Sequence, residues 1–143
     1  MEIQSPDKEI DLHRIILRYI HTRVRNETVL NKLRRSIEQH GQITPVLVVP
    51  ADAGRFVLID GYLRVLVIKK CGRDMVNALI CGAEEKDALF SVLRKGNERH
   101  WEAIEQASII RELIERFDMS MSEVAKKMAR DRSSSPGNEP AAE

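Results

Sequence analysis

The clearest hydrophobic pattern in the first half of the chain is helical. Its apolar positions recur at i, i+3 and i+7, and they are Leu30, Leu33 and Ile37. Asn26 is suited to accept hydrogen bonds from the amides at the start of such a helix, and Gly41 to end it in a left-handed conformation. The pattern therefore predicts a helix over residues 27–40.

A different pattern follows Pro45. Two runs rich in β-branched and apolar residues, 46–49 and 55–59, are separated by the Pro-, Asp- and Gly-containing segment 50–54. Such a pair of runs around a turn-forming cluster predicts a β-hairpin. Asp60-Gly61 interrupts the second run, and helical spacing then predicts a helix from residue 62 to a stop at Gly72, followed by a strand over 75–81.

The N-terminal region has a weaker pattern. Residues 1–8 are polar and contain a proline, which is typical of a flexible lead. Ile10 and Leu12 indicate a short strand, and the residues after them have poor periodicity, so an irregular stretch is expected up to Asn26.

Beyond Glu84 the pattern is helical throughout. It predicts helices over 85–95 and 102–117, with a polar break over 95–100 between them. Ser120 and Glu123 form a capping box, which predicts a short helix over 121–129. We expect three of its residues to face inward: Val124, Ala125 and Met128. Residues 133–143, rich in Ser, Pro and Gly, have the composition of a disordered tail.

The predicted architecture is therefore α+β, with an α+β domain over 9–83 and a helical segment over 84–132. A chain of 143 residues with 43% hydrophobic residues can build such a core, and the formal net charge of +1 provides no global attraction to nucleic acid or to an acidic membrane. Cys71 and Cys81 lack the spacing of a zinc site, and no apolar run is long enough for a membrane span. We expect a cytoplasmic protein with reduced thiols and no membrane partner.

One strand-to-helix junction offers candidate chemistry. A strand ending at Ile59, a turn at Asp60-Gly61 and a helix opening at Tyr62 would present free backbone amides that favour phosphate, and Arg64 could add a charged contact. The alternative is an ordinary turn with a surface arginine.

The polar break between the helices is a second candidate site. Asn97, Arg99 and His100 could converge on a ligand there, and a solvated loop is the alternative. The single tryptophan, Trp101, is expected to pack at the start of the following helix.

Basic residues cluster in and after the capped helix: Lys126, Lys127, Arg130 and Arg132. Such a cluster can contact phosphates, and two helices joined by the short turn at Asp118-Met119 are typical of the first half of a helix-turn-helix. A charged helix face that is only solvated explains the same residues equally well.

The order of these parts resembles the ParB family of DNA-partitioning proteins, and more closely its shorter ParB-like relatives. The matching segments, which span about residues 9–133, are Ser36-Ile37 with His40-Gly41, then Gln42 to Val48, Val57 to Arg64, Asn97, Ala103 to Ala107, and Met121 to Met128. The resemblance implies a ParB/sulfiredoxin-type α+β domain followed by a domain that carries a helix-turn-helix.

The resemblance also implies a nucleotide site. In the family, a Gly-Glu-Arg-Arg segment binds the phosphates of CTP with a metal ion, and a Glu-Asn-x-x-Arg segment completes the site. Gly61, Arg64 and Asn97 match these motifs, and the last arginine is either displaced to Arg99 or replaced by His100. The predicted phosphate-binding set is Gly61, Arg64, Asn97 and Arg99. CTP with Mg²⁺ is the implied cofactor.

This chain departs from the family motifs in several places. Tyr62 and Leu63 replace the glutamate and the first arginine, and Gly96 replaces the second glutamate. The lost carboxylate argues against CTP hydrolysis, so no catalytic residue and no metal ligand are predicted. The turn holds no cysteine, which excludes the activity of the sulfiredoxin branch.

A further departure follows the capped helix. The resemblance implies a recognition helix beginning near Ser133, but Pro136-Gly137 cannot continue one. The helix-turn-helix is therefore predicted to be incomplete, and DNA binding through Lys126, Lys127, Arg130 and Arg132 to be weak or non-specific.

The sequence thus predicts a ParB-like DNA-binding protein, responsive to CTP and related to chromosome partitioning or to plasmid or mobile-element maintenance. It would be associated with the nucleoid if DNA binding holds, and it could form a homodimer. Two alternatives stay open: a nucleotide-dependent phosphotransferase or NTPase on the same fold, and a non-enzymatic protein-interaction module.

Overall fold

The computed structural model of the chain describes residues 8–42, 44–98 and 103–133. The chain divides into two compact units, residues 1–88 and 89–143, and the helix α3 (Glu85–Glu98) begins in the first and continues into the second. The α+β fold class is confirmed, since the first unit combines a sheet with helices and the second is helical in its described part. The domain limits expected at residues 83 and 84 stay a prediction.

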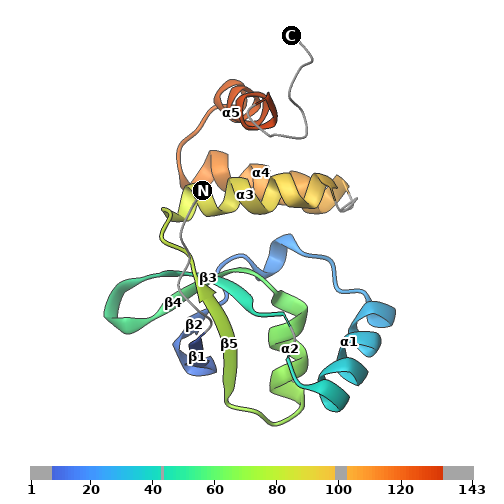
Figure 1. The fold of residues 1–143 in the computed structure, drawn as a ribbon. Coiled ribbons are helices and arrows are strands. Elements are labelled where there is room, and N and C mark those ends of the chain that lie inside the picture. The colour runs from blue at the N-terminus through green and yellow to red at the C-terminus, as the bar shows by residue number, and fades with distance from the viewer. Residues whose placement is uncertain (1–7, 43, 99–102, 134–143) are drawn as a thin grey trace. The chain divides into compact units, whose positions relative to one another are not determined.

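A five-stranded sheet organises the first unit (Figure 1). Its strands are β1 (Lys8–Asp11), β2 (Ile15–Ile16), β3 (Val46–Pro50), β4 (Phe56–Asp60) and β5 (Met75–Ile80), in the spatial order β1-β5-β3-β4-β2. β3 pairs antiparallel with β4, as the hairpin prediction requires, and parallel with β5. β1 pairs antiparallel with β5, and the two-residue β2 pairs parallel with β4.

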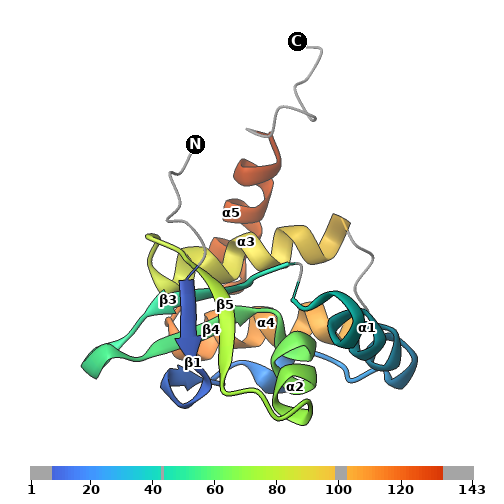
Figure 2. The same cartoon turned by 60° about the horizontal axis from the view of Figure 1, so that its bottom comes forward.

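Two helices cover one face of this sheet, and Figure 2 shows them side by side. α1 (Glu27–His40) begins as predicted, because the Asn26 side chain accepts a hydrogen bond from the Val29 amide at 3.1 Å. It ends at Gly41, whose φ is +75°. α2 (Tyr62–Lys70) is the helix predicted after the hairpin. The shared core holds these buried residues: Ile10, Leu30, Ile37, Val46, Val48, Leu58, Val65, Val67, Ile68, Val76 and Ala78.

The segment between β1 and α1 is more regular than its sequence predicts. It contains two 3₁₀ turns, Leu12–Arg14 and Ile20–Thr22, as well as the strand β2. Asp11 caps the first turn through a 2.8 Å bond from the His13 amide. Short 3₁₀ turns depend on such local bonds rather than on hydrophobic spacing, which explains why periodicity did not reveal them.

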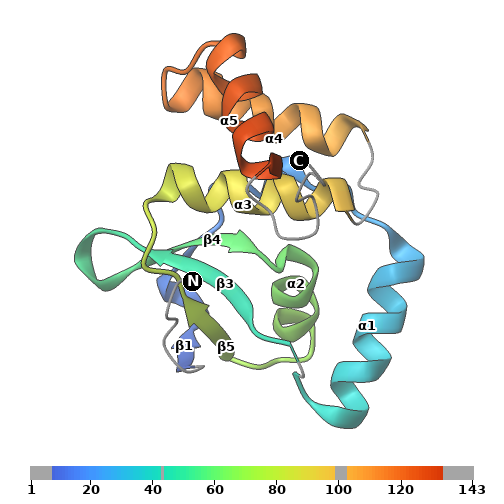
Figure 3. The ribbon, with the colours of Figure 1, turned by 45° about the horizontal axis from the view of Figure 1, so that its top comes forward.

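The second unit contains α4 (Ala103–Arg116) and α5 (Met121–Ser133), together with most of α3 (Figure 3). The capping box is confirmed: the Ser120 amide donates to Glu123 at 2.8 Å, and the Glu123 amide donates to the Ser120 hydroxyl at 3.0 Å. None of the helices in the described part of the chain combines the length and apolar composition that a membrane span needs.

Three predictions for the helical part were wrong. The polar break was expected from residue 95, but α3 continues to Glu98, so Asn97 lies in a helix. α5 continues to Ser133 rather than ending near 129, and Ala125 is exposed rather than inward. Polar residues do not end a helix unless they also cap it or break its backbone, which is why the composition misplaced these ends. Trp101, His100 and residues 134–143 lie outside the described residues.

Candidate anion site and nucleic-acid interface

The junction between β4 and α2 has the geometry predicted for it. Gly61 adopts a left-handed conformation with φ +108° between the strand and the helix. A Cβ atom at this position would lie 2.6 Å from Cγ1 of Val46, so only glycine fits the turn. Among the described residues, no side chain caps the start of α2, and its first turn holds no acidic residue. The amides at this end of the helix therefore present a partial positive charge.

A small hollow lies beside this turn. It is lined by Tyr19, Ile20 and Arg23 from the N-terminal segment and by residues 58–62. Its volume of about 10 Å³ is enough for roughly one water molecule, so it can seat one small polar group and no more in this conformation.

Arg23 and Asp60 form an ion pair at the hollow. Nη1 of Arg23 lies 3.2 Å from Oδ1 of Asp60, and the two side chains are only 23% and 15% exposed. A partly buried guanidinium next to free helix amides is suited to an anion, because the low local dielectric strengthens its interaction with a negative charge. In the structure Arg23 is held by Asp60, and an anion would compete for it.

Arg64 has a different environment from the one predicted. It lies in the first turn of α2, and its Nη2 is 3.4 Å from the carbonyl oxygen of Pro45, at the start of β3. It is partly buried and is not among the residues that line the hollow. Its role in binding phosphate stays a prediction.

The other two predicted members of the site can be located only along the chain. Asn97 lies in the last turn of α3, in the second unit, and Arg99 is outside the described residues. The four-residue site of Gly61, Arg64, Asn97 and Arg99 therefore stays a prediction.

Sequence reasoning missed Arg23 and Tyr19, which lie far from Gly61 in the chain and in a segment without periodicity. The one available signal was composition: two arginines and a tyrosine occur within residues 18–23. This composition indicates polar contacts, but it does not predict which residues the side chains contact.

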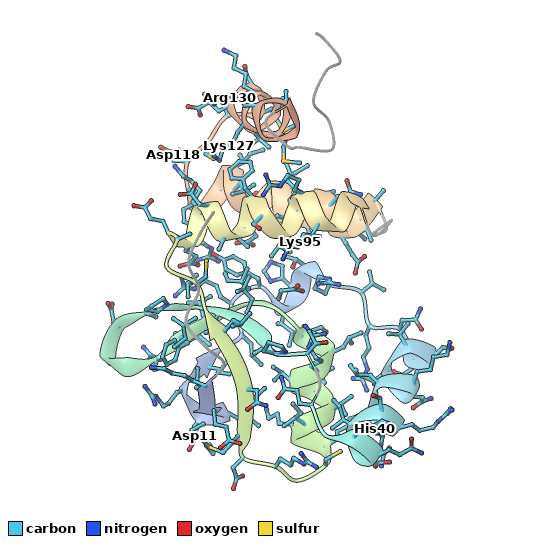
Figure 4. The ribbon with its side chains drawn as sticks, in the orientation of Figure 1. Asp11, His40, Lys95, Asp118, Lys127 and Arg130 are labelled. Atoms are coloured by element: carbon cyan, nitrogen blue, oxygen red, sulfur yellow. The ribbon has the colours of Figure 1, made fainter. Side chains whose placement is uncertain are left out.

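A larger hollow of about 430 Å³ lies elsewhere in the first unit, between the Leu12–Arg14 turn and the end of α2. Its charged lining is of both signs, with Lys69 and Arg73 set against Asp74. Asp11, labelled in Figure 4, directly precedes the Leu12–Arg14 turn. It accepts hydrogen bonds from the amide and the ring of His13, which lower the pKa of Asp11. Mixed charges do not select one ligand class, so we assign no site there.

The basic residues of α5 fall on two faces. Lys126 and Arg130 are exposed and lie one helical turn apart. Lys127 turns inward, with its ammonium group 5.2 Å from the centre of the buried Phe90 ring, and Figure 4 shows it and Arg130 on the same helix. Arg132 also lies on α5. The DNA-binding roles of Lys126, Lys127, Arg130 and Arg132 stay predictions.

The turn between α4 and α5 is short and specific. Asp118 adopts φ +58°, and the Met119 amide lies 3.4 Å from the Leu113 carbonyl oxygen at the end of α4. Val124 of α5 is 3% exposed, so this side chain is buried by the packing of the capped helix. The incomplete helix-turn-helix expected over these two helices stays a prediction.

Comparison with known proteins identifies the family of this chain. The model of the ParB N-terminal domain matches residues 3–96, which is more than half of the chain. This chain belongs to the ParB N-terminal domain family. Both the resemblance seen in its motifs and the predicted fold type are confirmed.

Individual relatives agree with this assignment. The ParB-like chain is 30% identical over 115 residues to the probable chromosome-partitioning protein ParB of Helicobacter pylori, an alignment that covers 80% of this chain and 39% of that protein. The chain thus spans about two fifths of the length of this curated relative.

Two solved structures share the fold. The pNOB8-like ParB N-domain aligns with a TM-score of 0.60 at 18% identity, covering 93% of this chain and 50% of the other. The C-terminally truncated ParB of Caulobacter crescentus, solved in complex with CTP-gamma-S, aligns with a TM-score of 0.58 at 20% identity, covering 87% and 71%. At these identities the structures establish the ParB-type fold alone.

Proposed function

We propose that this ParB-like chain is a DNA-binding protein that responds to a nucleotide, with CTP and Mg²⁺ as the first candidates. The observation that carries the proposal is the Gly61 turn, where uncapped helix amides lie beside the partly buried Arg23. A fold relative was solved with CTP-gamma-S, which supports the choice of nucleotide. Gly61, Arg64, Asn97 and Arg99 are the proposed phosphate-binding residues, and Arg23 joins them.

The proposed binding step begins with the Arg23–Asp60 ion pair. The hollow seats only one small group, so a nucleotide would place a phosphate oxygen at the α2 amides and leave its remaining atoms outside. The Arg23 guanidinium would then leave the Asp60 carboxylate and pair with the phosphate. Because the Asp60 carboxylate and the phosphate are both negatively charged, the partly buried guanidinium would remain ion-paired.

Calorimetric titration with CTP, with and without Mg²⁺, tests this site. Arg23→Ala should weaken binding about tenfold or more, because a charge-assisted hydrogen bond contributes about 1.5–3 kcal/mol. Arg34→Ala is the matched control, since Arg34 also pairs with a carboxylate, Glu38 at 3.2 Å, but on the exposed face of α1. Equal affinities for wild type and Arg23→Ala, or no heat with any nucleotide, would overturn the assigned site.

The α5 surface is proposed to bind DNA through Lys126 and Arg130. With a formal net charge of +1, the chain can attract DNA only through such a local patch, so affinity should fall steeply as salt is added. The pair Lys126→Ala and Arg130→Ala should reduce the slope of log affinity against log salt by about 2, at roughly 0.9 for each phosphate contact.

The control for this experiment is Lys95→Ala, which removes an exposed cation of the second unit from α3 instead of α5. Titration of labelled duplex DNA at several salt concentrations, followed by fluorescence anisotropy, gives the slopes. A slope that falls equally in the control and in the α5 variant would show unspecific charge attraction and count against an α5 interface. Binding that persists without any salt dependence would exclude it.

A further inference from the structure

The segment from Arg18 to Arg23 contacts two functional parts of the first unit at once. At one end it meets Glu85, the first residue of α3, and at the other it lines the hollow beside Gly61. α3 is also the helix that continues into the second unit. The segment is therefore placed to link the proposed anion site with this helix.

The contact with Glu85 is strong and directional. Nη1 of Arg18 lies 2.9 and 2.8 Å from the two carboxylate oxygens, and the Tyr19 hydroxyl donates to Oε2 of the same group. The Tyr19 residue is only 4% exposed, and the Arg18 and Glu85 side chains are 33% and 20% exposed. The hydrogen bond to Glu85 raises the pKa of Arg18 above its ordinary value, so the Arg18 guanidinium stays charged. Partly buried charge-assisted bonds of this kind hold one geometry.

The segment itself is locked between its two ends. The Thr22 hydroxyl donates to the Tyr19 carbonyl oxygen at 2.7 Å, and the Thr22 amide bonds the same oxygen at 3.0 Å. Thr22 is 3% exposed. Because these bonds close the 3₁₀ turn Ile20–Thr22, we expect Tyr19 and Arg23 to move together rather than independently.

We propose that Tyr19 is a positioning residue that couples the Gly61 hollow to the start of α3. Tyr19 is one of the residues that line the hollow, its hydroxyl is held by Glu85, and the turn that follows it carries Arg23 to Asp60. When Arg23 leaves Asp60 for an anion, the locked turn shifts and the bond from Tyr19 to Glu85 weakens. This inference rests on the proposed nucleotide site and names how that site would act on α3.

The coupling predicts that two variants bind CTP more tightly than the wild type. Tyr19→Phe keeps the ring and removes the hydroxyl, and Glu85→Gln keeps the size of the side chain and removes its charge. Both release the arrangement that holds Arg23 on Asp60, so CTP should bind about fivefold more tightly, at the low end of typical coupling between sites. A merely structural role would give weaker binding, because the loss of these bonds would loosen the site.

Glu27→Gln is the matched control, since it removes a carboxylate from the exposed pair of Arg25 and Glu27, 2.9 Å apart, in the same unit. It should leave the CTP affinity unchanged. Unchanged or weaker binding by both Tyr19→Phe and Glu85→Gln, with wild type binding normally, would overturn the coupling while leaving the proposed function intact.

A measurement without ligand separates the two hypotheses. In amide NMR spectra of the free chain, Glu85→Gln should shift the resonances of Asp60, Gly61 and Tyr62, although these residues lie more than twenty positions from Glu85 in the sequence. Shifts confined to residues 18–19 and 84–88 would overturn the coupling, whether or not CTP binds. Failure of the wild type to bind any nucleotide would instead overturn the proposed function.

Discussion

Gly61 shows how much one residue can decide in this fold. Its φ of +108° disfavours any side chain, and a Cβ would lie 2.6 Å from Cγ1 and 2.8 Å from Cβ of Val46. Val46 is fully buried, so it has no room to move away. We expect Gly61→Ala to lower the free energy of unfolding by about 2–4 kcal/mol, from overpacking and from the strained backbone together.

Gly72→Ala is the control for this prediction. Gly72 also has a positive φ, +77°, but no atom lies within 4 Å of a Cβ built there. It should therefore cost only the backbone contribution, about 1–2 kcal/mol. Urea denaturation of both variants checks the difference, and equal losses would show that Val46 yields and that the turn tolerates a side chain.

At the scale of elements, the capping box decides where α5 begins. Ser120 and Glu123 satisfy each other's backbone amides, and the rest of the first turn is exposed. Ser120→Ala should destabilise the start of the helix by about 1 kcal/mol, which corresponds to roughly fivefold faster hydrogen exchange at the Glu123 amide. Ser122 is also exposed and lies two residues after Ser120, so Ser122→Ala should leave that exchange rate unchanged. If both variants exchange alike, the box has no role in holding α5.

At the scale of the whole molecule, the two units divide the proposed work. The first carries the Gly61 turn and the second carries the exposed cations of α5, with α3 common to both. A balanced net charge of +1 leaves neither task to long-range attraction, so each depends on a local arrangement of side chains.

The sequence by itself determined the elements that depend on local signals. Asn26 and Gly41 bound α1, the hairpin of β3 and β4 follows its Pro- and Gly-rich turn, and Ser120 with Glu123 starts α5. Each of these rests on bonds within a few residues or on hydrophobic spacing, which can be read along the chain. The family resemblance carried by the ordered motifs was confirmed for the same reason.

The tertiary structure alone decided which distant residues meet. Arg23 reaches Asp60, Tyr19 and Arg18 reach Glu85, and the Lys127 ammonium group lies over the Phe90 ring. None of these pairs has a spacing that a helix or strand period would reveal, because each partner is brought into place by the packing of separate elements. The turn proposed to hold an anion was therefore visible in the sequence, and the residues that line it and reach the start of α3 were not.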